Sequence, residues 1–401
     1  MTRLAGESVQ SRTAAHGRPV RLLLAIDEME VGGTQRQIVQ LARALDPARF
    51  VIEVVYFRFS SFLVDELASL GVTVHHGPKS ARIDPGFVLA LRRLVVRGRY
   101  DLVHAFSFSS ELWCAVVLML TWPGRRPLLF SSVRGTYEWY GAMQWRIKRW
   151  VTARSSAVVA NSQAGACYAA DHLAISPAAI TLVYNGMPAP APALCTPAAR
   201  ALTRQTLGLA ADTVLLLFVG RLVEIKNVTT LLDALARVDS TRPFRLAIVG
   251  DGPLRAGLQA QAGRLGLDPR IDWLGERRDV PALMQASDVV ILPSWREGMS
   301  NVILEAMFMG RAVLASRAGG NVEAVQDEHT GILVDPGDAD AMAAAIGRLI
   351  ADPALVGRLG EAGRRRAHDC FGLPALAARM SALYLGALGR PVSASAAGEP
   401  A

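Results

Sequence analysis

The 401-residue sequence is poor in cysteine and in charge. Its four cysteines form no CxxC pair, which excludes a zinc ribbon and a disulfide framework. Few and widely spaced cysteines are typical of proteins in a reducing compartment. Only 19% of the residues are charged and 51% are hydrophobic, so a large core can form and global disorder is excluded. The 35 glycines and 21 prolines follow no period, which excludes collagen-like and coiled-coil chains.

No segment is predicted to cross a membrane. The strongly apolar, uncharged stretch Leu112–Gly124 has 13 residues and includes a proline, whereas a spanning helix needs about 20 apolar residues. The first apolar run, Val20–Ile26, contains Arg21 and precedes acidic residues without a cleavage-like site, so no signal peptide is predicted. We expect a cytoplasmic protein, which could also rest on the inner face of the cytoplasmic membrane.

The net charge of +8 lies in one half of the chain. Residues 1–200 hold 22 Lys and Arg against 13 Asp and Glu, whereas residues 201–401 hold 21 against 22. A basic half can bind nucleic acid, an anionic membrane or an anionic acceptor. Because no nucleic-acid recognition motif accompanies the charge, we expect no nucleic-acid partner.

Strand-like and helix-like segments alternate in two series. The first series of predicted strands is Arg21–Asp27, Phe50–Phe57, Val72–His76, Tyr100–Phe106, Pro127–Arg134, Ala157–Asn161 and Ile180–Tyr184. The second is Val214–Val219, Arg245–Val249, Ile271–Leu274, Val289–Leu292, Ala312–Ser316 and Gly331–Val334. The segments between the strands have apolar residues at helical spacing, which implies that helices connect the strands through right-handed crossovers. We therefore predict an α/β protein with two Rossmann-like, doubly wound parallel sheets.

Composition marks the boundaries between these parts. The segment Met187–Pro197 has four prolines in eleven residues and can continue neither sheet. We therefore predict a flexible N-terminus (1–18), a first domain (19–187), a linker (188–197), a second domain (198–372) and a flexible tail (391–401). The apolar run Leu373–Leu388 predicts a last helix, whose packing partner the spacing does not identify. Ligands of such sheets bind at the carboxyl ends of the strands, so the cleft between two domains is the expected site.

Two cations follow the first strand of the second series. Arg221 and Lys226 flank the start of a helix predicted at Asn227. A helix N-terminus favours an anion, and two cations there can neutralise a diphosphate without a metal. The alternative is a solvated loop with incidental charges.

The stretch after the strand Val289–Leu292 combines a loop with a helix start. Ser300 can cap a helix, a glycine just before it permits close backbone approach, and the first amides of the helix point outward. The candidate binding residues of this stretch are Gly298, Met299, Ser300 and Asn301.

Two carboxylates flank this helix start, Glu297 in the loop and Glu305 within the helix. The loop carboxylate can hold sugar hydroxyls, and the helix carboxylate can accept two bonds from a ribose diol. Glu305 could also be a surface charge, but most of its neighbours are apolar and burial of an unpaired carboxylate is costly. We therefore expect Glu305 to have a partner.

Glycine pairs and a histidine follow strands of the first series. Gly32 and Gly33 open a helix and, like Gly319 and Gly320 in the second series, offer amides to an anion or form a mere turn. His104 lies near a strand end, where it is either a ligand contact or a satisfied core residue. Walker A, HExxH, GxSxG and GxGxxG motifs do not occur, which removes the usual nucleotide hydrolases, zinc peptidases and α/β-hydrolases.

Taken in order, these residues resemble the family 4 retaining glycosyltransferases, which use two Rossmann-like domains in the GT-B arrangement. The resemblance covers nearly the whole chain and rests on the order and spacing of several short motifs. They are Gly32-Gly33, Asp101–His104, Val159–Ser162, Tyr184–Gly186, Gly220-Arg221 with Lys226-Asn227, Gly250–Pro253, Glu297 with Glu305, and Gly331–Val334.

The resemblance implies a role for each candidate. Arg221 and Lys226 would hold the donor diphosphate, Glu305 the ribose, and Glu297 the donor sugar, without metal or cofactor. Gly32 and Gly33 would approach the phosphates, and His104 would contact the transferred sugar. The last helix, 373–388, would pack back on the first domain.

The sequence departs from the family at two places. The family's Glu-Lys-Asn is here Glu224–Asn227 with an isoleucine inserted, which affects the register of the lysine. A second strand-end histidine of some relatives is replaced by the stretch Ser131–Gly135, in which Arg134 is a candidate acceptor residue.

The implied reaction moves a sugar from a nucleoside diphosphate sugar, UDP- or GDP-linked, to a hydroxyl of a saccharide or lipid-linked saccharide. A nucleotide-sugar epimerase of related fold and a non-catalytic sugar-binding relative are the alternatives. The segment Trp139–Trp150 mixes three tryptophans with three cations and is either a membrane-contacting helix or a helix that covers the core.

Overall fold

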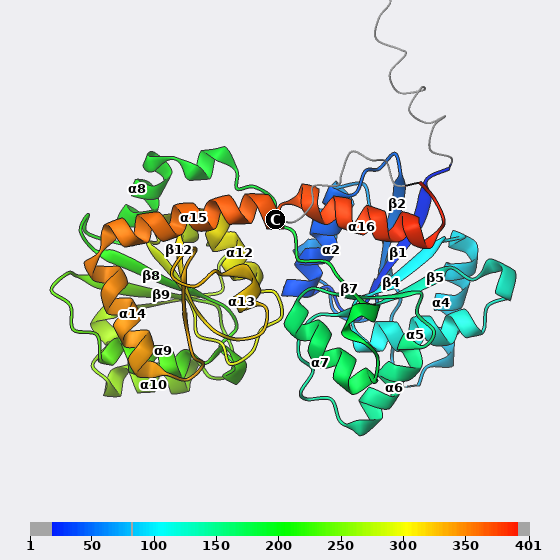
Figure 1. Cartoon of the computed structure of the whole chain (residues 1–401), viewed down its shortest axis with the longest axis horizontal. Helices are drawn as coiled ribbons and strands as arrows, with labels where there is room; N and C mark the ends of the chain where they lie inside the picture. Colours follow the sequence, from blue (N-terminus) through cyan, green and yellow to red (C-terminus); the bar gives the residue numbers. More distant parts are fainter. Residues whose placement is uncertain (1–17, 82, 392–401) are drawn as a thin grey trace, which may run out of the picture. The chain divides into compact units, whose positions relative to one another are not determined.

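The computed structural model describes residues 18–81 and 83–391 of the chain. They form two compact units (Figure 1), the first made of residues up to Gly186 together with those from Leu373 on, and the second of Met187–Gly372. Apart from Arg18 and Pro391, the predicted flexible ends lie outside the described residues.

The first unit contains a parallel sheet of seven strands in the order β3-β2-β1-β4-β5-β6-β7. The order reverses beside β1, which pairs with both β2 and β4, so the carboxyl ends of β1 and β4 form the switch point at which doubly wound sheets bind ligands. The strands are β1 (Val20–Ile26), β2 (Phe50–Tyr56), β3 (Thr73–His76), β4 (Leu102–Ala105), β5 (Leu128–Val133), β6 (Ala157–Ala160) and β7 (Ile180–Leu182).

Helices cover both faces of this sheet because its strands are apolar on both sides. Leu22 and Leu24 of β1 pack with α2, α3 and α16, whereas Leu23 and Ala25 pack with α4 and α5. The helices are α2 (Gly33–Ala44), α3 (Phe62–Ser69), α4 (Pro85–Gly98), α5 (Phe108–Met119), α6 (Ala142–Thr152), α7 (Gln163–Leu173) and α16 (Leu373–Ala387), with short 3-10 turns η1 (Pro123–Arg125) and η2 (Pro177–Ala179).

The last helix, α16, belongs to the first unit although it follows the whole second unit in sequence. It lies beside α2 (Figure 1) and inserts Leu376, Met380 and Tyr384 into the core. At the start of the crossing, Gly186 exchanges two hydrogen bonds of 3.0 and 3.1 Å with the Gln37 side chain on α2.

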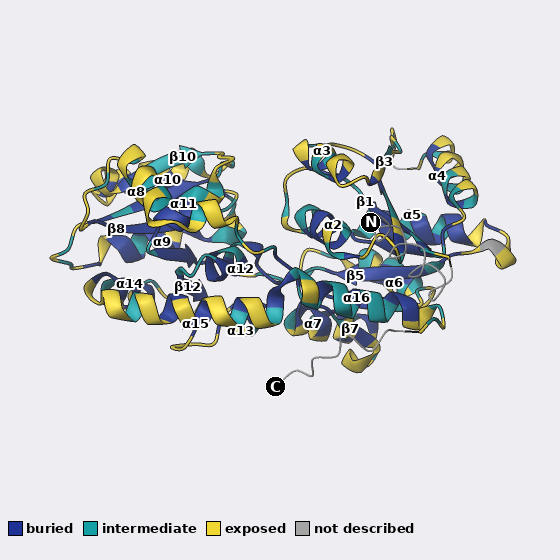
Figure 2. Cartoon of the chain, turned by 90° about the horizontal axis from the view of Figure 1, so that it is seen from above, coloured by how far each residue is buried: buried dark blue, intermediate teal, exposed yellow. Residues whose placement is uncertain are grey.

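The second unit contains a parallel sheet of six strands in the order β10-β9-β8-β11-β12-β13. Both sheets therefore have the predicted doubly wound, parallel form, and the fold prediction is confirmed. The strands are β8 (Val214–Val219), β9 (Phe244–Val249), β10 (Ile271–Gly275), β11 (Val289–Leu292), β12 (Ala312–Ser316) and β13 (Ile332–Val334). Figure 2 shows the buried strands of each unit beneath helices whose outer turns are exposed.

The helices of the second unit end with a long one, α15, that reaches the unit boundary at Gly372. The helices are α8 (Pro197–Thr206), α9 (Val228–Ala236), α10 (Arg255–Arg264), α11 (Val280–Ala286), α12 (Asn301–Phe308), α13 (Asn321–Ala324), α14 (Ala339–Ala351) and α15 (Pro353–Phe371), with 3-10 turns η3 (Pro192–Cys195), η4 (Glu224–Lys226) and η5 (Asp268–Arg270).

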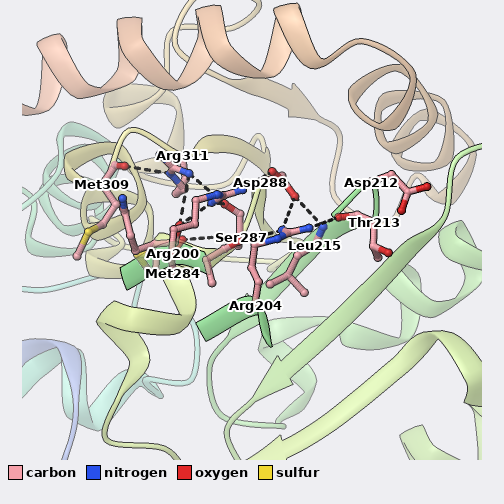
Figure 3. Close-up of polar contacts among 12 residues, drawn as sticks. Arg200, Arg204, Asp212, Thr213, Leu215, Met284, Ser287, Asp288, Met309 and Arg311 are labelled. Carbon is pink, nitrogen blue, oxygen red and sulfur yellow. Dashed lines mark hydrogen bonds and ion pairs between the residues drawn. The ribbon is translucent and has the colours of Figure 1, made fainter. Parts of the chain in front are cut away.

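Helix α8 follows the proline-rich segment, from which the sequence predicts only a linker. Its start signal is local, because Thr196 accepts a hydrogen bond from the Ala199 amide and a proline occupies the first turn. Two arginines of α8 then bind Asp288 beside β11 (Figure 3): Arg200 at 2.6 Å and Arg204 at 3.3 Å. The residues after the crossing are thus part of the second unit.

We expect Asp288→Ala to lower the free energy of unfolding by about 2–3 kcal/mol. The change removes the acceptor for both arginines and for the Leu215 amide, which donates to Asp288 at 2.8 Å. Urea unfolding measures the effect. Asp340→Ala is the control, because Asp340 pairs with Arg237 while its side chain is 86% exposed, and it should cost less than about 0.5 kcal/mol. Equal effects of the two substitutions would contradict this account.

Candidate active site

Two loops at the carboxyl edge of the second sheet are packed backbone against backbone. The Leu222 amide donates to the Asp251 carbonyl at 2.9 Å, which joins the loops after β8 and β9. A Cβ atom at Gly250 would collide with the Gly220 carbonyl, and one at Gly252 would collide with that of Leu222. Gly250 also has φ +124°, a conformation that L side chains rarely adopt. Glycine is therefore required where these loops meet.

The loops after β11 and β12 are joined in the same way. The Gly320 amide donates to the Gly298 carbonyl at 3.1 Å. Gly319 has φ +53°, and a Cβ atom there would collide with the Glu297 carbonyl. The glycine pair after β12 thus packs its backbone against the loop that carries Glu297. From the sequence motif alone, the pair could equally have been an anion site or a turn.

Lys226 and Glu297, from different loops, form an ion pair of 2.5 Å. The same carboxylate oxygen accepts a bond of 2.7 Å from the Ser294 hydroxyl. The side chains of Lys226 and Glu297 are 23% and 12% exposed, so both charges are largely shielded. The pair shows that the lysine, in spite of the inserted isoleucine, points to the same loop edge as Glu297.

Asn227 shapes the turn that presents Lys226. It adopts the left-handed conformation (φ 50°), which asparagine tolerates better than most residues, and its side-chain amide donates to the Pro293 carbonyl at 3.2 Å. Arg221, at the start of the same loop, is exposed, and its guanidinium makes no hydrogen bond or ion pair with another described residue. A fixed lysine and an unpaired arginine therefore lie on one loop.

Helix α12 starts as the sequence predicts, with the Ser300 hydroxyl accepting from the Ile303 amide at 3.5 Å. Met299, Ser300 and Asn301 are at most 9% exposed. Glu305, one turn further on, is half-buried. The structure brings these residues and Glu297 together at one edge of the second unit.

The first unit has polar groups without partners at the same edge of its own sheet. Buried side-chain atoms that accept or donate no hydrogen bond among the described residues include Oδ1 of Asp27, Nε of Arg134 and Oδ1 of Asn161. These residues follow β1, β5 and β6, so they mark three strand ends. Buried polar atoms without partners are rare and call for a ligand or water.

Arg134 is the cation of this edge. Its guanidinium lies over the Phe106 ring, 4.7 Å from the centroid, and burial lowers its pKa to about 10. It lines a small cavity of about 10 Å³ with Phe106, Tyr184 and Asn185. No carboxylate of the described residues pairs with it, so it can take an anionic or hydroxyl group.

Asp27 also lies at this edge, although the sequence did not predict it as a site residue. Burial is the main cause that raises its pKa, and hydroxyls of the Ser107–Ser110 turn oppose the shift. Its place directly after β1, at the switch point, is the signal that could have identified it. Gly32 and Gly33 lie nearby in sequence, as the N-cap and first residue of α2.

His104 lies within the core of the first unit. Its side chain is fully buried, with Nδ1 2.6 Å from the Tyr384 hydroxyl on α16 and Nε2 2.9 Å from the Ser132 hydroxyl. Burial, and secondarily the charge of Arg134, hold its pKa well below the usual value. Both ring nitrogens are occupied, which favours the core interpretation, and the contact with the transferred sugar stays a prediction.

The tryptophan-rich segment is divided between core and surface, because Trp139 and Met143 are 63% and 60% exposed whereas two other side chains are buried. Trp145 is 7% exposed on α6, and Lys148 forms a buried ion pair of 2.5 Å with Glu111. Glu111 also accepts from the Ser132 amide at 2.8 Å, and Lys148 donates to the Ser132 carbonyl at 2.8 Å. The pair therefore braces the end of β5, two residues before Arg134. The sequence did not indicate this pair, because Glu111 and Lys148 lie on different helices.

Among the residues that the structure describes, no three His, Cys, Asp or Glu side chains form a group that could hold a metal ion. Within that same part of the chain, no helix combines the length and apolar character needed to span a bilayer.

Comparison with known proteins identifies the class to which these units belong. The model for Glycosyltransferase Family 4 matches residues 31–189, and that for Glycosyl transferases group 1 matches residues 213–352. The structure of HepE from Anabaena in complex with UDP has a TM-score of 0.81 and 23% identity, and the match covers 92% of this chain and all of that one. The shared fold is GT-B.

Two curated relatives extend the comparison. The lipopolysaccharide core biosynthesis glycosyltransferase LpsE of Rhizobium meliloti is 36% identical over 41% of this chain and 47% of its own length. The D-inositol 3-phosphate glycosyltransferase of Salinispora arenicola is 29% identical over 84% of both chains. The chain belongs to the family 4 glycosyltransferases, as the sequence resemblance indicated.

We expect Lys148→Met to lower the free energy of unfolding by about 3–5 kcal/mol, because it leaves the Glu111 carboxylate buried without its cation. The double substitution Lys148→Met with Glu111→Leu should recover much of that loss. Urea unfolding of the single and double variants forms the cycle. Additive losses in the double variant would show that the two side chains do not act as a pair.

Proposed function

We propose that the protein transfers a sugar from a nucleoside diphosphate sugar to an acceptor hydroxyl, with retention of configuration at the transferred carbon. The observation that carries the proposal is the second unit's edge, where Lys226, Glu297, Arg221 and the start of α12 come together. Family membership supplies the reaction class, and the charges of this edge suit a diphosphate.

The donor nucleotide is assigned to the second unit. The Arg221 guanidinium has no partner among the described residues and is available to a phosphate, and Lys226 adds a second cation on the same loop. Glu305, half-buried on α12, would accept the ribose hydroxyls. HepE was solved with UDP, which makes UDP the first nucleotide to test and GDP the second.

The same groups would stabilise the departing nucleotide. Negative charge develops on the β-phosphate as the bond to the sugar breaks, and fixed cations and helix amides aimed at it lower the barrier. In the proposed mechanism Arg221 and Lys226 supply that charge without a metal ion, and no cofactor takes part.

The bonding of Glu297 favours attack on the same face of the sugar over a double displacement. One oxygen of this carboxylate already accepts from both Lys226 and Ser294, which lowers its nucleophilicity. In the proposed step the acceptor oxygen bonds to the sugar carbon as the bond to the β-phosphate breaks, and the acceptor proton passes to the departing phosphate. Glu297 would bind hydroxyls of the transferred sugar.

The acceptor is assigned to the first unit. Arg134 and Asp27 offer an unpaired guanidinium and a carboxyl oxygen without a partner among the described residues. Gly32 and Gly33, at the N-terminus of α2, would approach the donor phosphates. A saccharide or lipid-linked saccharide is the acceptor class that we propose, and the cytoplasm is the proposed location.

We expect UDP or GDP to raise the melting temperature without added metal, because a ligand at 100 times its Kd stabilises the folded state by about 2.7 kcal/mol. Differential scanning fluorimetry measures the shift. Glu305→Ala should abolish most of it, whereas Asp340→Ala on the exposed side of α14 should not. No shift with any nucleotide would remove the support for a donor site, and the sugar-binding alternative would then be favoured.

We expect Lys226→Ala to lower kcat/KM roughly ten- to 150-fold, which corresponds to a loss of about 1.5–3 kcal/mol of transition-state stabilisation. The substitution removes a charge-assisted bond to the leaving phosphate. Arg264→Gln, a charge change on the exposed side of α10, is the control. An unchanged kcat/KM in Lys226→Ala would contradict the phosphate role.

NMR of the product determines its anomeric configuration, and a new sugar nucleotide formed without acceptor would indicate an epimerase.

A further inference from the structure

The connection from α5 to β5 exposes three large apolar side chains within four positions. Trp122 is 79% exposed, Leu120 is 56% exposed and Met119 is 48% exposed. Single exposed apolar residues are ordinary, but a contiguous group on a surface marks an interaction site. This connection enters the amino end of β5, so the group lies at the edge of the sheet opposite Arg134.

Arginines are fixed beside these apolar residues. Arg92 of α4 donates through Nε to the Leu120 carbonyl at 2.9 Å, and Arg126 donates through Nη2 to the Met119 carbonyl at 2.9 Å. Both arginines bind the last carbonyls of α5, where a helix end favours cations. The apolar group is thus flanked by guanidiniums from two elements.

A groove on the other flank of α4 adds two more cations. It encloses about 460 Å³ and is lined by Arg93 and Arg97 of α4 and by Glu53, which already binds three partners in the sheet. Arg21, His75 and Tyr100 contact the Glu53 carboxylate at 2.6, 2.7 and 2.7 Å. Arg93 and Arg97 are exposed, and their guanidiniums make no hydrogen bond or ion pair with another described residue, so they are available to an external anion.

The sequence around these arginines contains no acid to oppose them. There is no Asp or Glu between Pro85 and Tyr100, and none between Leu112 and Tyr137. The outer turns of α4 are exposed in Figure 2. A surface on which positive charges surround an apolar group is complementary to an anionic surface that also accepts apolar side chains.

We propose that this basic face, made of Arg92, Arg93, Arg97, Met119, Leu120, Trp122 and Arg126, docks the first unit on a membrane that contains anionic lipid. Trp122 and Leu120 would enter the headgroup boundary, where tryptophan is enriched, and Arg93 and Arg97 would bind lipid phosphates. Neither apolar insertion nor electrostatic attraction alone holds a protein firmly on a bilayer, but the two together do.

The location differs from the one that the sequence suggested. Trp145 and Lys148 of the tryptophan-rich segment are buried, so that segment cannot present its full set of aromatic and basic side chains. The basic face lies at the amino edge of the first sheet, whereas Asp27, Arg134 and the start of α2 lie at its carboxyl edge. Docking would therefore leave the proposed acceptor residues uncovered, and the inference stands apart from the proposed reaction.

The test is co-sedimentation of the full chain with two kinds of vesicles, pure phosphatidylcholine and phosphatidylcholine with about 30% phosphatidylglycerol. We expect binding to the anionic vesicles only, and weaker binding as salt is raised. Arg93→Gln with Arg97→Gln should weaken partitioning about thirtyfold, because each arginine near an anionic surface contributes about 1 kcal/mol. Leu120→Ser with Trp122→Ser should weaken it independently through the apolar term.

Matched controls separate this face from net charge and from the other tryptophans. Arg264→Gln with Arg358→Gln removes the same charge from the second unit, and Trp139→Ala with Met143→Ser removes exposed apolar groups before and on α6. Both controls should bind as the unaltered chain does. Thermal unfolding and transfer to a water-soluble acceptor should stay unchanged in all variants, which separates failure of docking from failure of the enzyme.

Three outcomes would overturn the proposal. They are equal binding to both kinds of vesicle, unaltered binding of both basic-face variants, and an equal loss in the controls. Binding of a single-stranded oligonucleotide that is lost in the basic-face variants, without any vesicle binding, would assign the face to nucleic acid instead.

Discussion

The second unit depends on close approach of main chain to main chain at the carboxyl edge of its sheet. Gly250, Gly252 and Gly319 lie where a single Cβ atom would collide with a neighbouring loop. Without that approach the loops after β8 and β11 could not bring Lys226 within 2.5 Å of Glu297. The constraint explains why the edge contains so many short backbone contacts and why its charges are held in place before any ligand arrives.

The first unit uses a different device at the corresponding edge. Its strand end at β5 is held by the buried pair of Glu111 and Lys148, and its β4 by the bond from His104 to Tyr384 of the last helix. Lysine is rare in this chain, at three residues, and two of them form the ion pairs that organise the two edges. Arginine carries nearly all the remaining positive charge and most of the surface contacts.

The two edges of the first sheet differ in chemistry. The carboxyl edge combines buried, partly unsatisfied polar atoms with one shielded guanidinium, which suits recognition of a small polar molecule. The amino edge exposes arginines and a tryptophan, which suits an extended anionic surface. The excess positive charge of residues 1–200 is therefore not spread evenly over the unit, and much of it gathers on α4 and beside the end of α5.

The sequence by itself determined the two parallel sheets, because buried parallel strands read as apolar runs separated by helical spacing, and it located the loops that bear Arg221, Lys226, Glu297 and Glu305. Only the tertiary structure decided which side chains meet. His104 reads as a strand-end polar residue but is buried against Tyr384, which lies 280 positions away. Glu111 with Lys148, the α8 anchor at Asp288 and the exposed apolar group around Trp122 were decided in the same way. Burial and pairing depend on contacts between distant segments, and local periodicity does not encode them.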